Sequence, residues 1–401
     1  MLNESERGRE SYFSPTPATS GQPLDPTAPL RDKLREAVGD VFFVETEIPG
    51  AQATLDPRVT VTYTGRLLTD SESAYNRLDE SFKALDHVPI LSENHGRQII
   101  TALKGRFVPK PHDWRINAAL LIATVLSLLY VGASGEIGIL NNPVQILAGW
   151  PYALGVMLIL GTHELGHYFA ARFHKSDVSL PFFIPMPLPG SLGTMGAFIQ
   201  LREPLRNRKV LLDIGVAGPL AGFLMAIPVL LIGLKTSPVL SSPILSVFML
   251  KASTASYVLE GNSVVYALAK ILVFGHFYPD GMRDVFINQL ASAGWTGLLV
   301  TGLNLLPIGQ LDGGHALYSL IGDRARSLFF PVLVLMAILA TLYTGWTLWL
   351  FLLFFFGRVY ATPLDNLTPL DPRRRVVAIL SLLLFFLVFM PIPYQLYTIG
   401  Q

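Results

Sequence analysis

Residues 157–175, MLILGTHELGHYFAARFHK, begin as an apolar run and then place His163, Glu164 and His167 close together. A charged side chain at the centre of a bilayer costs about 2.5–3.5 kcal/mol, so it is kept there for a function. The three residues have the spacing H-E-x-x-H. Residues i and i+4 share one face of a helix, so both imidazoles can bind one metal ion beside a basic carboxylate. The stretch therefore predicts a metal site on a membrane helix.

The composition predicts a polytopic membrane protein. Of the 401 residues, 51% are hydrophobic and 15% are charged, whereas soluble proteins carry about 25% charged residues. Several stretches reach the length of about 20 apolar residues that crosses a bilayer. The net charge of +1 gives no basic field, so we expect no nucleic-acid partner. The absence of cysteine excludes disulfides, thiolate metal sites and cysteine nucleophiles.

Three regions follow from composition and periodicity. Residues 1–30, rich in Ser, Pro and Thr and without the apolar core of a secretory signal, are expected to form a disordered lead. Residues 31–108 predict a soluble α+β domain, with helical spacing in 30–41 and 73–86 and strand-like stretches in 42–48, 59–68 and 88–100. Residues 109–401 form the predicted membrane-embedded domain.

The membrane domain contains several predicted spans: 116–133, 143–173, 210–234, 295–307 and 376–393. Residues 328–356 are too long for one untilted helix and could turn at YTGW. Residues 243–282 are expected to cross the membrane twice or not at all, because the spans on either side require both ends of this region to lie on the same side of the membrane. The loop 174–209 is basic, so the positive-inside rule predicts that it and the N-terminal domain are cytoplasmic. The H-E-x-x-H motif then lies in the cytoplasmic half of its span.

A third metal ligand is expected, because two histidines leave a catalytic zinc one protein ligand short. The segment NLLPIGQLDGGH, residues 304–315, offers Asp312 among residues that break a helix. Taken alone, Asp312 is equally well explained as a helix cap. With H-E-x-x-H upstream, ligation is the better interpretation.

Four segments together resemble one family. HELGHYFAARF and NLLPIGQLDGGH, with GTMGAFIQL and DIGVAGPLAGF between them, resemble the site-2 protease family of intramembrane zinc metalloproteases. They are most similar to its EGY-like branch from plastids and cyanobacteria, which carries a soluble domain before the spans. The resemblance covers about 110–375 well and the N-terminal domain loosely. It implies a mostly α polytopic membrane protein: a site-2 protease-like helical core, a small β hairpin after the H-E-x-x-H helix, and an N-terminal soluble α+β domain. No inserted PDZ-like domain is evident.

The resemblance also implies a chemistry. His163, His167 and Asp312 would hold Zn²⁺, and Glu164 would act as general base while a zinc-bound water attacks the peptide carbonyl. The substrates would be single-span membrane proteins, cut in their transmembrane segments near the cytoplasmic face. Asn304 would place its amide near the scissile carbonyl or orient Glu164; an interhelical hydrogen bond is an equally good interpretation.

The resemblance places a small sheet, after the motif helix, beside the active site. We expect residues 193–201 to offer a strand edge to an unwound substrate segment, because helical carbonyls are shielded from attack. The candidate edge residues are Gly193, Thr194, Met195, Gly196, Ala197 and Phe198. A purely structural hairpin is the alternative.

Two other classes of function compete with proteolysis. A metal-ion transporter or sensor could use the same His/Asp cluster, but its path needs polar groups at several depths and it has no use for Glu164. A non-catalytic membrane-binding protein would leave the burial of that carboxylate uncompensated. The expected partners are the lipid bilayer and membrane-protein substrates; the oligomeric state is not predicted. We expect the bacterial cytoplasmic membrane, because no organelle transit peptide is evident, although a mature plastid form could look similar.

Overall fold

The computed structural model describes residues 28–108, 113–137, 141–188, 190–241, 256–280 and 283–398. Most of the expected disordered lead, residues 1–27, lies outside the described residues. Residues 28–30 already belong to the first helix, α1 (Ala28–Gly39).

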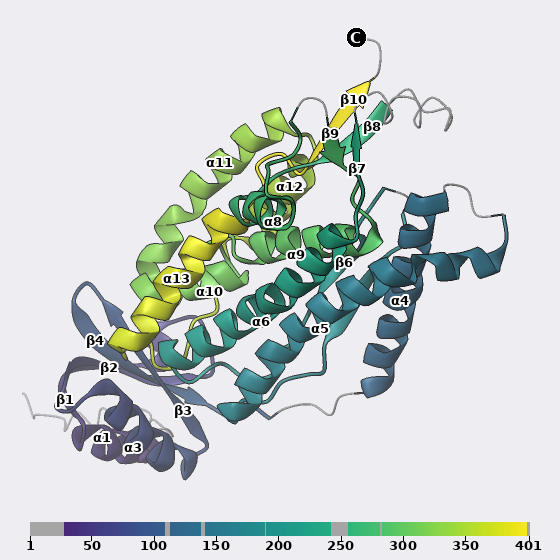
Figure 1. The fold of residues 1–401 in the computed structure, drawn as a ribbon. Helices are drawn as coiled ribbons and strands as arrows, with labels where there is room; N and C mark the ends of the chain where they lie inside the picture. The colour runs from purple at the N-terminus through teal and green to yellow at the C-terminus, as the bar shows by residue number, and fades with distance from the viewer. Residues whose placement is uncertain are drawn as a thin grey trace, which may run out of the picture.

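The N-terminal region folds as a four-stranded antiparallel sheet covered by helices (Figure 1). Its strands are β1 (Phe42–Pro49), β2 (Val59–Leu67), β3 (His87–Asn94) and β4 (Arg97–Lys104), in the order β1-β2-β4-β3. The helices are α1, the single turn α2 (Gly50–Ala53) and α3 (Ser71–Lys83). Alternate residues such as Val61 and Tyr63 are buried, as expected for a sheet with one covered face. The predicted order of helices and strands is found.

The rest of the chain is mainly helical. Its helices are α4 (Trp114–Ile137), η1 (Pro143–Gly149), α5 (Trp150–Phe173), α6 (Arg208–Lys235), α8 (Val264–Phe274), α9 (Gln289–Asn304), α10 (Asp312–Ile321), η2 (Gly322–Leu328), α11 (Phe329–Leu342), α12 (Trp346–Phe356) and α13 (Pro372–Val388). Within the residues that the structure describes, four helical segments are long and apolar enough to cross a membrane: 114–135, 143–173, 208–235 and 312–342. The chain is therefore a multi-pass integral membrane protein with a helical core and a β-containing N-terminal region.

Helices α5, α6 and α9 pack together at the centre, and glycines bring them close. A Cβ on Gly294 of α9 would lie 2.5 Å from the Leu230 Cα of α6. A Cβ on Gly233 of α6 would lie 2.2 Å from the Ala291 nitrogen of α9. Small residues at these points allow helix backbones to approach where larger side chains would separate them.

The predicted hairpin follows α5. Strands β5 (Phe182–Met186) and β6 (Gly193–Phe198) form a two-stranded antiparallel sheet. The sheet is attached to α4, because the Ser127 hydroxyl donates a 2.6 Å hydrogen bond to the Gly193 carbonyl. The hairpin therefore has a fixed position beside the central helices.

The described part of the region between α6 and α9 contains no helix long enough to be a candidate membrane span. It holds β7 (Val239–Ser241), β8 (Ser256–Glu260), β9 (Arg283–Val285) and α8. β7 pairs with β9, and β8 pairs with the C-terminal strand β10 (Tyr394–Thr398). The 11 residues of α8 extend about 16 Å, too short for a hydrocarbon core of about 30 Å. These strands lie at the end of the molecule away from the N-terminal sheet (Figure 1).

Two other predicted spans differ from simple helices. The segment 328–356 is divided into α11 and α12 at 343–345, within YTGW. Helix α9 has only 16 residues and ends at Asn304, because the chain turns before Pro307. The break after α9 lies inside the protein, since Leu305, Leu306 and Ile308 are buried, and irregular backbone is tolerated there. The break at 343–345 is more open, with Thr344 and Gly345 exposed.

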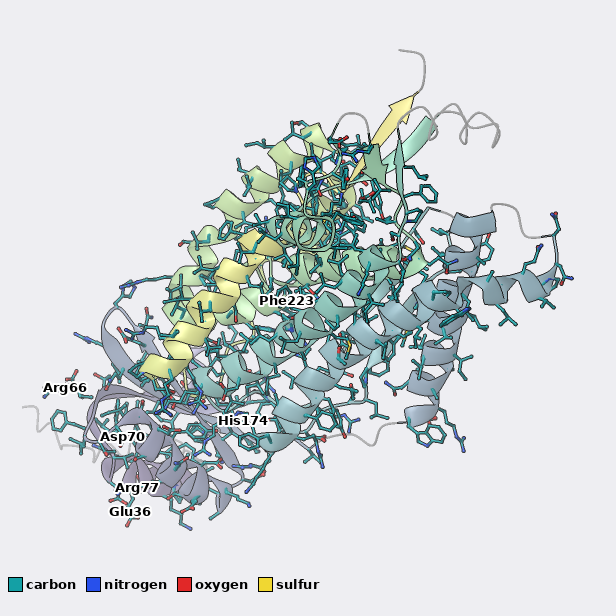
Figure 2. The ribbon with its side chains drawn as sticks, in the orientation of Figure 1. Glu36, Arg66, Asp70, Arg77, His174 and Phe223 are labelled. Carbon is teal, nitrogen blue, oxygen red and sulfur yellow. The ribbon has the colours of Figure 1, made fainter. Side chains whose placement is uncertain are left out.

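The N-terminal domain is attached to the helices by the docking loop, residues 361–371, which joins α12 to α13. Leu91 of β3 donates from its N–H to the Leu364 carbonyl at 2.8 Å and accepts from the Asn366 N–H at 2.9 Å. Leu364 and Leu367 pack on the core of the N-terminal domain. Figure 2 shows Glu36, Arg66, Asp70 and Arg77 on this domain, with His174 at the end of α5 nearby. The loop thus covers the β3 edge.

Candidate active site

Helix α5 brings His163, Glu164 and His167 to one buried position. The Nε2 atoms of the two histidines are 3.2 Å apart, and their rings stand edge to face. The helix is polar only at this point of its buried face, which is the arrangement that the motif spacing predicts.

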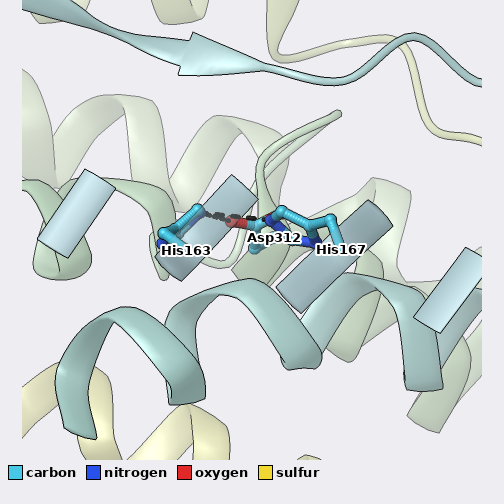
Figure 3. Close-up of side chains that lie close together, drawn as sticks. All are labelled: His163, His167 and Asp312. Atoms are coloured by element: carbon cyan, nitrogen blue, oxygen red, sulfur yellow. Dashed lines mark hydrogen bonds and ion pairs between the residues drawn. The ribbon is translucent and has the colours of Figure 1, made fainter. Parts of the chain in front are cut away.

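Asp312 reaches the histidines from a different helix. It is the first residue of α10, and its two carboxylate oxygens lie 3.3 Å from His163 Nε2 and 3.4 Å from His167 Nε2 (Figure 3). The turn before it is tight: a Cβ on Gly313 would lie 2.0 Å from the Leu305 carbonyl oxygen, and one on Gly314 would lie 2.4 Å from the Gly309 oxygen. Only glycine allows this backbone, and the backbone sets the position of Asp312.

Helix α6 orients the histidines from the opposite side. His167 Nδ1 lies 2.7 Å from the Ile214 carbonyl oxygen, which can only accept, so Nδ1 carries the proton and Nε2 keeps its lone pair. Three glycines give room to the imidazoles. A Cβ on Gly218 would lie 2.1 Å from His167 Nε2, one on Gly222 3.0 Å from His163 Cβ, and one on Gly215 2.8 Å from His315 Cβ.

Sequence reasoning did not assign a role to these glycines or to the Ile214 carbonyl. The signal is present, because Gly215, Gly218 and Gly222 are spaced i, i+3 and i+7 and so share one face of α6. The segment DIGVAGPLAGF contributed only to the resemblance.

A cavity of about 180 Å³ opens at this cluster. Its lining includes His163, Glu164, His167, Asn304, Asp312, His315, Ala197 and Phe198. Glu164 Oε2 is buried with no hydrogen-bond partner among the described residues, and the same holds for His315 Nδ1. The Asn304 amide nitrogen lies 3.2 Å from His163 Nε2, so Asn304 contacts a histidine of the motif. A buried carboxylate oxygen with no partner is costly and marks a group kept for chemistry.

The candidate edge strand approaches the cavity only with its second half. Gly193 and Thr194 are buried, and the Thr194 hydroxyl donates to the Ile184 carbonyl at 2.8 Å. Ala197 and Phe198 line the cavity, and Met195 is 52% exposed. Among the described strands, β6 pairs with β5 alone. The Gly196 N–H donates to the Thr194 hydroxyl at 3.0 Å and the Gly196 carbonyl accepts from it at 3.1 Å, so the side of the strand that faces away from β5 is open only at the residues on either side of Gly196.

The three donor groups fit a divalent metal ion. One atom each from His163, His167 and Asp312 lie within 4.8 Å of one another. A tetrahedral site with metal–ligand bonds near 2.0–2.1 Å has edges of about 3.3–3.4 Å, close to the 3.2 Å between the two Nε2 atoms. The Asp312 carboxylate approaches His163 Nε2 with one oxygen at 3.3 Å and His167 Nε2 with the other at 3.4 Å. Two imidazoles and one carboxylate leave a fourth position open, which is the ligand set of hydrolytic zinc sites.

Comparison with known proteins agrees with this geometry. Residues 151–344 match the model of Peptidase family M50. The chain is 32% identical over 256 residues, 63% of its length, to probable zinc metalloprotease EGY2, chloroplastic, from Arabidopsis thaliana, of which 44% is covered. It is 37% identical over 177 residues, 44% of its length, to probable zinc metalloprotease EGY1, chloroplastic, from Oryza sativa subsp. japonica, of which 28% is covered.

A longer match covers more of the chain. The chain is 27% identical over 372 residues, 88% of its length, to probable zinc metalloprotease EGY2, chloroplastic, from Oryza sativa subsp. indica, of which 64% is covered. The chain thus spans less than two thirds of the length of these curated relatives. No solved structure matches. Residues 151–344 are thus similar to Peptidase family M50, and the chain as a whole is similar to the EGY zinc metalloproteases.

Proposed function

We propose that this protein is an intramembrane zinc endopeptidase that cuts the transmembrane segments of single-span membrane proteins. The observation that carries the proposal is the cluster of His163, His167 and Asp312 beside the unpartnered Glu164 carboxylate, in a cavity bordered by β6. A site that only stored or transported a metal ion would have no use for that free carboxylate.

His163 and His167 would hold the zinc ion through Nε2, and Asp312 through its carboxylate. When bound, zinc supplies a Lewis acid that lowers the pKa of water toward about 7. Glu164 takes the proton from the attacking water and delivers it to the leaving amide nitrogen, because Oε2 faces no competing partner. Asn304, next to His163, donates from its amide to the carbonyl oxygen as charge develops there.

The substrate would bind as an extended strand. Backbone groups on either side of Gly196 in β6, on the side away from β5, would pair with a substrate segment that has lost its helical hydrogen bonds. Ala197 and Phe198 border the cavity, so a strand added here passes Glu164 and the histidines. The edge supplies the extended conformation that hydrolysis requires.

The proposed topology follows the charges. The loop 174–209 and the N-terminal domain, residues 31–108, would lie on the cytoplasmic side, with residues 109–401 forming the protease domain. The N-terminal domain takes the place of an inserted recognition module. The curated relatives are named chloroplastic, whereas the bacterial cytoplasmic membrane is the location that we propose for this chain.

The test combines metal content with cleavage. Zinc per chain is measured by elemental analysis of detergent-purified wild type, Asp312→Ala and Glu164→Gln, with the exposed Asp40→Ala, outside the cavity, as matched control. We expect about one zinc in wild type, Asp40→Ala and Glu164→Gln, and a large loss in Asp312→Ala. In liposomes with a single-span reporter, Glu164→Gln should cleave at least about 100-fold more slowly. Wild-type protein that stays without zinc when zinc is supplied, or wild-type cleavage by Glu164→Gln, would refute the proposal.

A further inference from the structure

A second cavity, of about 260 Å³, lies at the junction of η2, α11 and the end of α12. It is lined by Arg326, Phe329, Phe330, Arg358 and Tyr360, none of which borders the candidate active site. Two arginines and three aromatic rings thus surround one open space, and the proteolytic chemistry makes no use of it.

Arg358 stacks on two aromatic rings. The Arg358 guanidinium carbon lies 5.3 Å from the centre of the Phe329 ring and 5.0 Å from that of Phe354. No carboxylate lies within ion-pair distance of Arg358 in the part of the chain that the structure describes. Stacking on the face of an aromatic ring leaves the N–H groups at the edge of a guanidinium free to bind an anion.

Arg326 is placed in a similar way. Its guanidinium carbon lies 5.8 Å from the centre of the Tyr360 ring and 6.0 Å from that of Tyr318. The Tyr360 hydroxyl donates to the Ala325 carbonyl at 3.2 Å, which fixes the ring beneath it. Arg326 also contacts Asp323 at 3.1 Å, but both side chains of this pair are about half exposed, so the pair is weak and easily exchanged.

The surroundings of the cavity are apolar and exposed. Phe330 is 64% exposed and Phe356 is 67% exposed. Helix α11 runs along the outer edge of the helical bundle (Figure 1) and is almost entirely apolar, and η2 with Arg326 lies directly before its first residue. The cavity lies at the end of α11 near the docking loop, because Asp323 of η2 accepts a hydrogen bond from Asn366. Cationic side chains at the end of a lipid-facing apolar helix lie at the level of the headgroups.

We propose that this cavity binds the phosphate of an anionic phospholipid, with the acyl chains along the exposed faces of α11 and α12. The guanidinium fork of arginine matches a phosphate group in shape and charge, and basic pockets between spans bind lipid headgroups. The exposed phenylalanines favour a lipid over free phosphate, because only a lipid covers them. The inference depends on the membrane spans alone and is independent of proteolysis.

The experiment measures lipid affinity directly. Phosphatidylglycerol is titrated into the full chain in neutral detergent, and retained lipid is counted by native mass spectrometry for wild type, Arg358→Gln and Arg326→Gln. Arg324→Gln, an exposed arginine on the same turn outside the cavity, is the matched control. We expect binding about tenfold weaker in the two cavity variants, as for the loss of a charge-assisted hydrogen bond. The control should change less than about threefold.

Several results would overturn the proposal. Equal weakening in Arg324→Gln would show a diffuse charge effect, and phosphatidylcholine binding as tightly as phosphatidylglycerol would show that the negative charge is not recognised. Inorganic phosphate that displaces the lipid at equal concentration would identify a free anion as the ligand. Arg326→Gln provides an independent readout should Arg358→Gln fail to fold.

Discussion

Gly218 shows how strongly one residue can determine the proposed metal site. It lies on α6 with its Cα facing His167, and any side chain there would occupy the position of the imidazole, since a Cβ would lie 2.1 Å from Nε2. The imidazole cannot rotate away cheaply, because Nδ1 is bonded to the Ile214 carbonyl. The site therefore depends on a residue that offers no ligand atom.

We predict that Gly218→Ala lowers bound zinc from about one per chain to a small fraction, because it displaces His167 Nε2. The matched control is Gly161→Ala on α5, where an added Cβ meets no atom within 4 Å. Elemental analysis of both variants, with thermal unfolding to verify the fold, is the measurement. Full zinc content in a folded Gly218→Ala protein would contradict the geometry described for α6.

For the individual residues of the metal site, the spacing along the sequence was the basis of the prediction. His163 and His167 are one helical turn apart and Glu164 follows His163 directly, so their convergence follows from the sequence alone. Asp312 could be inferred from the need for a further ligand, but its distance to the histidines depends on the turn at Gly313 and Gly314. The contribution of α6 requires knowledge of which helix packs against α5, and no local pattern contains that information.

Strand β6 is the element on which the proposed substrate binding depends. Met195 lies at its midpoint, is 52% exposed and falls at the irregularity in the pairing with β5. A proline there removes a backbone donor from the strand without removing a buried side chain.

We predict that Met195→Pro slows cleavage of a reporter at least about tenfold while Met195→Ala stays within about twofold of wild type, because a lost strand hydrogen bond weakens pairing and a truncated exposed side chain does not. The measurement is cleavage in liposomes at matched zinc content. An equal effect of both substitutions would favour side-chain contact over strand addition.

The elements themselves were partly predictable. Alternating residues in 59–68 and 193–198 indicated the strands found there, and the YTGW break fell where turn-forming residues indicated it. Apolar composition does not distinguish a short packed helix from a membrane span, so the sequence allows either two crossings or none in the region 235–285. In the structure α8 is an apolar helix of 11 residues with Tyr266, Ala269 and Lys270 buried, shorter than the candidate membrane spans.

The molecule as a whole is held together where the N-terminal domain meets the helices. Asn366 of the docking loop accepts a 2.9 Å hydrogen bond from Arg208 Nε at the start of α6 and donates a 3.1 Å bond to Asp323. Lys209 adds an ion pair of 2.7 Å to Glu72 of the N-terminal domain. The contact therefore joins the domain to the helix that orients His167.

We predict that Asn366→Ala destabilises the folded chain by about 1–3 kcal/mol, because it removes the hydrogen bonds that this buried side chain makes to two charged partners, the Arg208 guanidinium and the half-exposed Asp323 carboxylate. Asn76→Ala on the exposed face of α3 is the control and should change stability by less than about 0.5 kcal/mol. Thermal unfolding in detergent is the measurement. Identical unfolding midpoints for Asn366→Ala and Asn76→Ala would show that the docking loop contributes little to holding the N-terminal domain against the helices.

A pH dependence is expected from the same loop. Burial raises the pKa of Asp365 above its usual value of 3.8, despite hydrogen bonds from Leu367 and Thr368. The folded state therefore binds the proton more tightly than the unfolded state, and stability falls as the pH rises from about 4 through the folded pKa. Asp365→Asn should abolish this decline. Unfolding free energies measured from about pH 4 to 6 check it, and an unchanged slope in the variant would contradict the assignment.

The docking loop also has a consequence for how the chain is made. Ser71 and Thr368, which share a 2.8 Å hydrogen bond, are 297 residues apart, so the N-terminal domain is synthesised long before the loop that covers its β3 edge. An uncovered edge strand is a template for pairing with other chains. During translation and membrane insertion this domain would then need protection by a chaperone, and a chain truncated before residue 361 should aggregate through β3 although its sheet is complete.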